Sequence, residues 1–263
     1  MSIIDVEGLT KSFGGFTAVD GITFQVKAGE VFAFLGPNGA GKTTTIKMLT
    51  TLLKAGGGRI TIDGHDVAAD PMGVRRSFGI VFQDPSLDDE LSARENMQLH
   101  AVLYAVPPAE VDARVTEMLR FVDLLDRQAS MVKTFSGGMK RRLEIARGLL
   151  HHPKILFLDE PTVGLDPQTR NHIWDYIQRL QRQEGITVFL TTHYMDEAEK
   201  VADRVAIIDH GKLVVQGTPK QLKARTRTRS LEAAFIKLTG HGIRAEEASG
   251  TDKMRQARKM WRR

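Results

Sequence analysis

Short apolar runs alternate along the chain with longer segments in which apolar residues recur at helical spacing. Residues 155–158 and 186–190 show no alternation of polar and apolar positions, as expected of strands that helices cover on both faces. A segment with helical periodicity, near residues 168–183, lies between them. Strands that alternate with helices indicate a parallel sheet. The pattern therefore predicts an α/β fold.

The rest of the chain supplies further elements of both kinds. Residues 1–35 are predicted to form short strands with turns, because Gly14-Gly15 and Ala28-Gly29 interrupt the pattern. Residues 84–150 are predicted to be mostly helical and to form an inserted subdomain, since they break the strand–helix alternation. The other expected elements are strands at 30–35, 59–63 and 79–82, helices at 42–53, 93–103, 108–125 and 136–150, and a hairpin that turns at 209–212.

Composition narrows the class of protein. With 263 residues, 41% of them hydrophobic and 26% charged, the chain suits a soluble globular protein of one large or two small domains. No apolar run approaches the roughly 20 residues that span a bilayer, and the first residues lack the pattern of a signal peptide. The absence of cysteine excludes a disulfide framework, a thiolate metal site and cysteine catalysis.

The positive charge is concentrated near the C-terminus. Residues 220–263 contain 13 basic and 4 acidic residues, whereas the rest of the chain contains 24 basic and 28 acidic residues. The main body therefore gives no reason to expect nucleic-acid binding. Met254, Ala257, Met260 and Trp261 recur at helical spacing among basic residues. That spacing indicates either an amphipathic segment that contacts a membrane or partner, or a solubilising chain end.

A glycine-rich segment follows the strand expected at 30–35 and opens the helix expected at 42–53. The pattern of Gly, any four residues and then Gly-Lys-Thr is typical of loops that bind nucleoside phosphates. The alternative is a chance glycine turn, which would not need a strand before it and a helix after it. Its backbone N–H groups would point at phosphate oxygens, and the helix N-terminus favours an anion. Lys42 can reach the β- and γ-phosphates, and the Thr43 hydroxyl can bind Mg²⁺. The predicted ATP-binding residues here are Gly36, Pro37, Asn38, Gly39, Ala40, Gly41, Lys42, Thr43 and Thr44.

Polar side chains also follow the other predicted strands. Asp159 and Glu160 come after the strand at 155–158, Gln83 after the strand at 79–82, and His193 after the strand at 186–190. An acidic pair alone would suit a helix cap or a solvated loop, and a single Gln or His would suit a structural role. In an open parallel sheet, however, ligands bind at the carboxyl ends of the strands. These groups are therefore expected to converge on one nucleotide, with Asp159 near Mg²⁺ and Glu160 able to deprotonate water.

A second glycine pair opens the helix expected at 136–150. Ser136 is a plausible N-cap, and Gly137 and Gly138 would let a phosphate approach the first N–H groups closely. Met139 completes the motif Ser-Gly-Gly-Met. Taken alone, it is either a second anion site without an assigned ligand or an ordinary glycine-containing cap.

Over about residues 3–220 these motifs resemble, in content and order, the nucleotide-binding subunits of ABC transporters. The resemblance implies a P-loop NTPase with a RecA-like core, an antiparallel β subdomain and an inserted α-helical subdomain at about 84–150. It divides the chain into an ATPase domain, residues 1–220, and a basic C-terminal extension, residues 221–263.

The resemblance also implies a role for each motif residue. Glu160 and His193 would be catalytic, Thr43, Gln83 and Asp159 would hold Mg²⁺, and Asp166 would belong to the D-loop, residues 163–166. Phe13 would stack on adenine, and Val19 lies where a second adenine contact is expected. The signature motif in trans would be Ser136, Gly137, Gly138 and Met139, facing ATP on a second subunit.

Two departures from the family pattern are visible. The signature has Phe135 and Met139 where leucine and glutamine are usual, but it keeps the serine and both glycines. Phe13 replaces the commoner tyrosine, which keeps stacking and loses a hydroxyl. Both sites of a dimer are therefore expected to be active.

Residues 84–91, Glu95-Asn96 and residues 231–240 look like drug-resistance exporters of the ABC-2 group, the daunorubicin-resistance type. This implies a homodimer that uses ATP and Mg²⁺, binds no nucleic acid, and lies at the cytoplasmic face of the cell membrane, attached to a separate ABC-2 permease. Import in place of export stays open, as does a heterodimer in place of a homodimer. So do two different functions: a soluble ABC ATPase in translation or DNA repair, and a nucleic-acid-binding regulator that uses the basic C-terminal residues.

Overall fold

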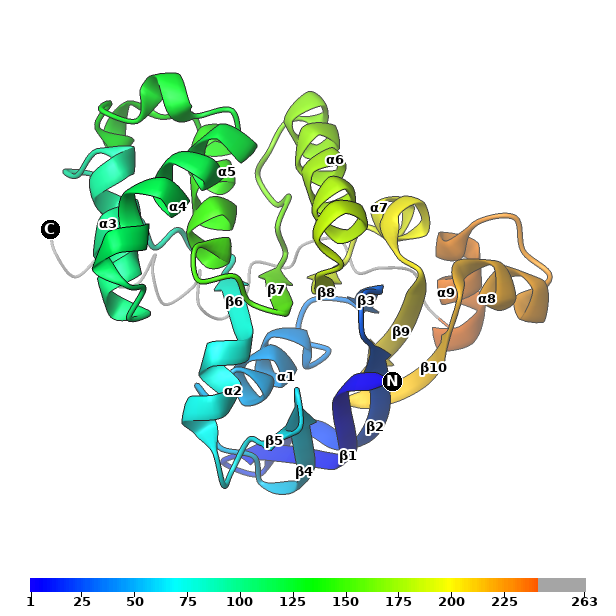
Figure 1. Ribbon diagram of the computed structural model, residues 1–263. Helices are drawn as coiled ribbons and strands as arrows, with labels where there is room; N and C mark the ends of the chain where they lie inside the picture. The colour runs from blue at the N-terminus through cyan, green and yellow to red at the C-terminus, as the bar shows by residue number, and fades with distance from the viewer. Residues whose placement is uncertain (241–263) are drawn as a thin grey trace, which may run out of the picture.

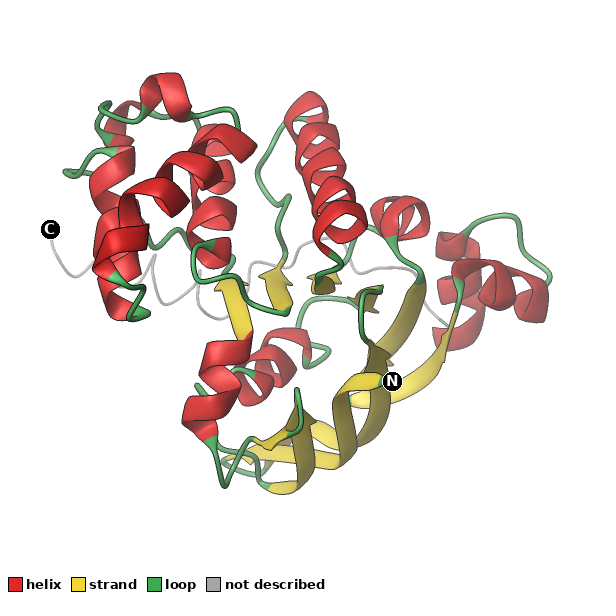
Figure 2. Cartoon of the chain, viewed as in Figure 1, coloured by secondary structure: helices red, strands yellow, loops and turns green. Residues whose placement is uncertain are grey.

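The structure is a computed structural model that describes residues 1–240. It has a central six-stranded sheet, a four-stranded antiparallel sheet below it, and a block of helices beside the edge strand β6 (Phe78–Val81), as Figures 1 and 2 show. The predicted α/β fold, with an antiparallel β subdomain and an inserted helical subdomain, is confirmed. The amphipathic pattern expected at 252–263 lies outside the described residues.

The six-stranded sheet supplies the carboxyl ends at which the motif residues gather. Its strand order is β10-β9-β3-β8-β7-β6, with all neighbours parallel except β9 and β10. Side chains of β7 alternate between two hydrophobic cores: Leu156 and Leu158 face one, and Ile155 and Phe157 face the other. The strands are β3 (Val31–Leu35), β6 (Phe78–Val81), β7 (Ile155–Asp159), β8 (Thr187–Thr192), β9 (Arg204–Asp209) and β10 (Lys212–Gly217).

The antiparallel sheet has the order β2-β1-β4-β5. The prediction of short strands over residues 1–35 is wrong, because β1 and β2 are 12 residues each. Their pairing contains register shifts, which let a long ribbon bend and twist without ending. The strands are β1 (Ser2–Phe13), β2 (Phe16–Lys27), β4 (Gly57–Ile62) and β5 (His65–Asp66).

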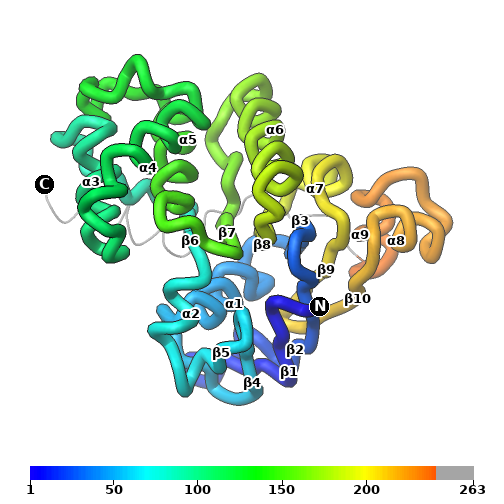
Figure 3. The backbone as a smooth tube through the Cα atoms, in the orientation of Figure 1, coloured from blue at the N-terminus to red at the C-terminus, as the bar shows by residue number. Residues whose placement is uncertain are grey.

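Helices cover the central sheet and build the inserted subdomain, as the continuous trace in Figure 3 shows. The expected helix at 93–103 is confirmed, and the helices expected at 42–53 and 108–125 end earlier, at Leu49 and Phe121. Among the described residues, no helix combines the length and apolarity needed to cross a membrane. The helices are α1 (Lys42–Leu49), α2 (Pro71–Ser77), α3 (Ala93–Leu103), α4 (Pro108–Phe121), α5 (Gly137–Leu149), α6 (Pro167–Glu184), α7 (Met195–Val201), α8 (Pro219–Thr226) and α9 (Leu231–Thr239).

The two last helices pack onto the body of the protein. Leu222 of α8 and Leu231 and Phe235 of α9 are buried and belong to the same hydrophobic core as the sheet. Glu199 of α7 accepts a hydrogen bond from the N–H of Leu231 at 2.7 Å. The division of the chain at residue 220 stays a prediction.

A stack of three rings beside the helical subdomain predicts acid sensitivity. Tyr104 lies between His100 and His151, with ring centroids 4.6 and 4.0 Å apart. Burial lowers the pKa of His100 to about 3 and that of His151 to about 4. Below their ordinary pKa, the unfolded chain therefore binds protons at these two histidines that the folded chain does not. Their contribution to the free energy of unfolding is fully present above about pH 6.5 and is lost as the pH falls below that value.

Acidification from pH 7 to pH 5 is expected to lower the free energy of unfolding by about 4 kcal/mol through these two groups. Urea titrations at both values measure the loss. His100→Phe keeps a ring in the stack and should remove about half of it. The same substitution at the exposed His172 is the control and should leave the pH dependence unchanged; equal pH dependence in all three proteins would contradict the prediction.

Candidate nucleotide site

Loops at the carboxyl ends of the strands enclose one cavity of about 280 Å³. The glycine-rich loop follows β3, Gln83 follows β6, and Glu160 follows β7. The hairpin of β1 and β2 closes another side. Residues of three separate segments, which the sequence predicts to meet at the carboxyl ends of parallel strands, therefore line the same cavity. The lining residues are Phe13, Phe16, Ala18, Pro37, Asn38, Gly39, Gly41, Lys42, Thr43, Thr44, Gln83 and Glu160.

Glycines let the glycine-rich loop pack closely against neighbouring backbone and lead into the first turn of α1. A Cβ atom at Gly36 would lie 2.3 Å from the carbonyl of Ile208, and one at Gly41 would lie 2.5 Å from the carbonyl of Ala18. Gly41 is also in the left-handed region, at φ 106°, and is the N-cap of α1 without a side-chain cap. The N–H groups of the first turn have no acceptor inside the helix, so they are available to an anion at the cavity wall.

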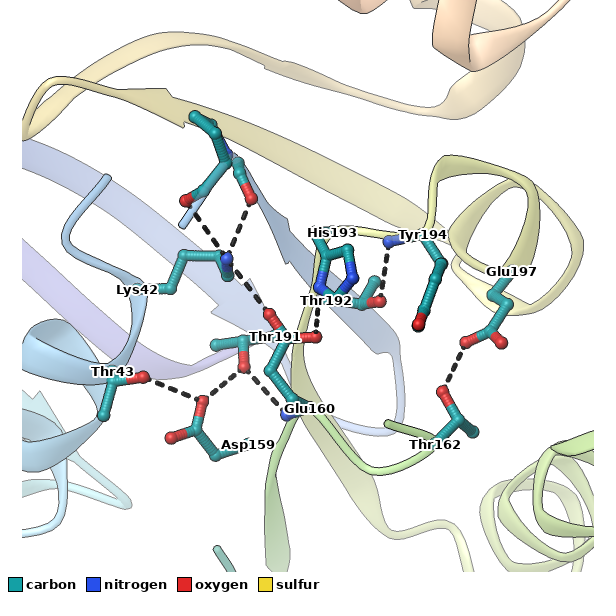
Figure 4. Close-up of polar contacts among 12 residues, drawn as sticks. Lys42, Thr43, Asp159, Glu160, Thr162, Thr191, Thr192, His193, Tyr194 and Glu197 are labelled. Carbon is teal, nitrogen blue, oxygen red and sulfur yellow. Dashed lines mark hydrogen bonds and ion pairs between the residues drawn. The ribbon is translucent and has the colours of Figure 1, made fainter. Parts of the chain in front are cut away.

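Lys42 and Glu160, which line the cavity, form a connected polar cluster with His193 (Figure 4). Lys42 Nζ lies 3.0 Å from Glu160 Oε1 and donates to the carbonyl of Gly36 at 2.8 Å. Glu160 Oε2 lies 2.9 Å from His193 Nδ1. Lys42 and Glu160 are each 5% exposed, so both charges act in a poorly screened environment.

The carboxylate of Glu160 is ionised in this cluster. Burial acts to raise its pKa, but the hydrogen bond with His193 and the charge of Lys42 outweigh burial, and the pKa lies below its ordinary value. The backbone of Glu160 adopts φ 50°, a left-handed conformation that non-glycine residues adopt at a cost. Its N–H donates to the carbonyl and the hydroxyl of Thr191, both at 3.1 Å. The neighbouring strand β8 therefore helps to hold this turn.

Asp159 contacts Thr43 in the first turn of α1, directly after the glycine-rich loop. Its Oδ1 accepts from the hydroxyl of Thr191 at 2.6 Å and from that of Thr43 at 3.3 Å. Burial raises its pKa above the ordinary value, and these hydrogen bonds oppose the rise. Among residues 1–240, no group of three or more His, Cys, Asp or Glu side chains could hold a metal ion. Mg²⁺ needs only one or two carboxylates when phosphates complete its shell, so Thr43 and Asp159 fit that ion.

The Ser-Gly-Gly-Met motif lies outside this cavity. Ser136 is the N-cap of α5 and accepts from the N–H of Met139 at 3.3 Å, as predicted. Ser136 and Gly137 are exposed, so a phosphate group could reach the start of the helix. Asp166 is the N-cap of α6 and accepts from the N–H of Thr169 at 3.0 Å and from its hydroxyl at 2.6 Å.

Three predicted ATP-binding residues, Val19, Gly36 and Ala40, do not line the cavity, and neither do Asp159 and His193. Val19 is fully buried in the core against the glycine-rich loop, and its neighbour Ala18 faces the cavity instead. Ala40 is 3% exposed and also belongs to that core. Sequence reasoning missed Phe16, which is 64% exposed and lies opposite Phe13 across the hairpin. The sequence signal for Phe16 was its place next to Gly14-Gly15, with one phenylalanine on each side of the glycine pair.

Sequence reasoning also missed two residues that hold the site together. Thr191 connects Asp159 with the backbone of Glu160. Arg141 of α5 donates to carbonyls of the segments that follow β6 and β7, including that of Glu160 at 3.2 Å. Nothing in the sequence separates these two from other threonines and arginines, because their partners include backbone groups.

Comparisons with known proteins agree with this geometry. A family model described as "ABC transporter" matches residues 19–163. The daunorubicin/doxorubicin resistance ATP-binding protein of Streptomyces peucetius is 46% identical over 221 residues, which are 84% of this chain and 67% of the relative. The linearmycin resistance ATP-binding protein of Bacillus subtilis is 41% identical over 241 residues, 92% of this chain and 76% of the relative. A solved structure of an ATP-binding subunit of an ABC transporter matches with a TM-score of 0.81 and 32% identity, covering 90% of this chain and 100% of its own.

Proposed function

This chain belongs to the ABC transporter family as an ATP-hydrolysing subunit, and we propose that it powers the export of drugs, antibiotics or other small hydrophobic or lipid-like compounds through a separate permease. The names of its relatives support export, since they describe resistance to daunorubicin, doxorubicin and linearmycin. The observation that best supports hydrolysis is the contact of the Glu160 carboxylate with both Lys42 and His193.

The residues present fit ATP and Mg²⁺. When bound, ATP supplies the phosphoryl group, and Mg²⁺ is the cation that neutralises its developing charge. Lys42 and the N–H groups of the first turn of α1 bind phosphate oxygens. Thr43, Gln83 and Asp159 hold the metal, and Phe13 stacks on the adenine ring. Phe16 and Ala18, which line the same cavity, extend the apolar surface offered to the base.

Glu160 is the general base in this proposal. Its carboxylate accepts a proton from the attacking water at Oε1 or Oε2. His193 fixes the orientation of the carboxylate through the contact of its Nδ1. Lys42 exchanges its ion pair with Glu160 for a phosphate contact, which releases Oε1 toward the water.

A second subunit completes the site. The exposed N-terminus of α5, with Ser136, Gly137, Gly138 and Met139, faces the γ-phosphate held by the other copy, and Asp166 lies at the subunit boundary. ATP is then buried between two copies of the chain, and its hydrolysis releases them. The resulting population shift between closed and open dimers drives the permease.

Ser136→Arg tests this arrangement in trans. The bulky cation would occupy the space in front of the helix start, so ATP-dependent dimerisation is expected to fall by at least about tenfold. ATP binding by a single subunit should stay within about twofold of the wild type. Size-exclusion chromatography with ATP and binding of a fluorescent ATP analogue measure the two effects. Lys133→Arg, at an exposed position in the same region, is the control, and unchanged dimerisation in Ser136→Arg would refute the trans site.

The proposed partner is an ABC-2 type permease, and the proposed location is the cytoplasmic face of the cell membrane. Purification of the tagged chain from detergent-solubilised membranes of its host tests both. Recovery of a polytopic membrane protein in stoichiometric amount would support the exporter. Recovery only with ribosomes or DNA would favour a soluble ABC ATPase in translation or repair, and an external binding protein among the partners would favour import.

A further inference from the structure

Arg141 is a buried arginine of α5 whose donors point mainly at main-chain carbonyls beside the cavity. Its side chain is 7% exposed. Nε donates to the carbonyl of Pro161 at 2.7 Å, and Nη1 donates to the carbonyl of Phe82 at 2.5 Å. Nη2 donates to the carbonyls of Asp159 and Glu160, both at 3.2 Å. One side chain of α5 therefore contacts the segments that follow β6 and β7.

Glu144, one turn further along α5, completes this set of contacts. Its carboxylate is 2% exposed and lies 3.2 Å from Arg141 Nη1. The same carboxylate accepts from the N–H of Ser86 at 2.8 Å. The five N–H donors of a guanidinium thus have five acceptors. Together Arg141 and Glu144 hold both ends of residues 82–86, the segment that contains Gln83.

The contacts also bear on the strained turn at Glu160. The φ of 50° at this residue persists only when its surroundings determine it strongly. Arg141 binds three consecutive carbonyls of that turn, those of Asp159, Glu160 and Pro161. Without these bonds the turn can relax, and the carboxylate of Glu160 would leave the position in which it contacts Lys42 and His193.

We propose that Arg141 is a positioning residue that connects the signature helix α5 to Glu160 and to the segment of Gln83. This inference rests on the roles proposed above for those two residues. Engagement of the N-terminus of α5 by the ATP of a partner is transmitted through Arg141 to the general base and to the loop beside the metal. A lysine keeps the positive charge, but its three donors cannot replace five planar ones.

Arg141→Lys in the full-length chain is the first test. We expect kcat for ATP hydrolysis to fall by at least about tenfold, because small displacements of a catalytic group are costly. The KM for ATP should stay within about threefold, since the groups that bind ATP are untouched. Arg94→Lys is the control: Arg94 makes three side-chain hydrogen bonds within the helical subdomain, to Gln128, Asp112 and Thr116, and should change neither parameter more than about twofold.

A double-mutant cycle with Glu160→Gln separates positioning from general destabilisation. If Arg141 acts through Glu160, adding Arg141→Lys to Glu160→Gln should lower the residual rate by less than about twofold. The same loss in both backgrounds, or an unchanged kcat in the single variant, would overturn the proposal.

If Arg141→Lys does not fold, Glu144→Gln replaces it and should lower kcat at least about threefold at constant KM. An unchanged kcat in that variant would again overturn the proposal. Hydrolysis at the wild-type rate by Glu160→Gln alone would instead refute the assignment of Glu160 as the general base.

Discussion

Glu160→Gln is expected to lower kcat by about a thousandfold, within the range that a positioned general base contributes. Glutamine has nearly the same shape, and its single amide oxygen can keep only one of the two contacts that the carboxylate makes with Lys42 and His193. The amide accepts no proton from water. ATP binding should persist, so the variant should accumulate as an ATP-filled dimer. Phosphate release and size-exclusion chromatography with ATP measure the two effects.

Glu30→Gln is the matched control for this prediction. Glu30 is also a buried glutamate, 8% exposed and paired with Arg204 at 2.9 Å, but it lies just before β3, away from the cavity. Its replacement should change kcat by less than about twofold. Normal hydrolysis by Glu160→Gln would mean that another group deprotonates the water.

Lys42→Ala is expected to weaken ATP binding by at least about a hundredfold. The substitution removes charge-assisted hydrogen bonds to phosphate in a poorly screened site, where each is worth about 1.5–3 kcal/mol. It also leaves Glu160 without its cation, so the pKa of that carboxyl should rise. Titration with a fluorescent ATP analogue measures the affinity.

Lys47→Ala provides the comparison, because Lys47 lies on the same short helix and is exposed. Its loss should change ATP affinity by less than about twofold. Equal affinities of Lys42→Ala and the wild type would exclude the phosphate contact that the glycine-rich loop predicts.

The convergence of the motif residues could be predicted from the sequence because it depends on topology alone. Once the strands are parallel, the residues after them meet at one edge of the sheet. The proximity of Lys42, Gln83 and Glu160 could therefore be predicted without further information. The N-cap Ser136 was equally accessible, since a cap is a local feature.

Other features depend on geometry that no residue pattern records. Val19 and Ala18 are adjacent, and a difference of one position along a strand decides which side chain faces the cavity. The twelve-residue strands β1 and β2 depend on register shifts that a glycine pattern alone does not reveal. The contacts of Arg141 were invisible because four of its five acceptors are backbone carbonyls, which every residue has.

The left-handed backbone at Glu160 has an evolutionary consequence. Asparagine, aspartate and glycine adopt this conformation more readily than glutamate, so their introduction relieves strain while it shortens or removes the carboxylate. In the folded chain the ion pair with Lys42 opposes this relief of strain, but bound ATP gives Lys42 a phosphate partner instead. In the ATP-bound protein, selection for turnover is therefore what keeps glutamate there. After gene duplication, one copy could lose hydrolysis in a single mutational step and persist as a stable, ATP-binding partner of the other.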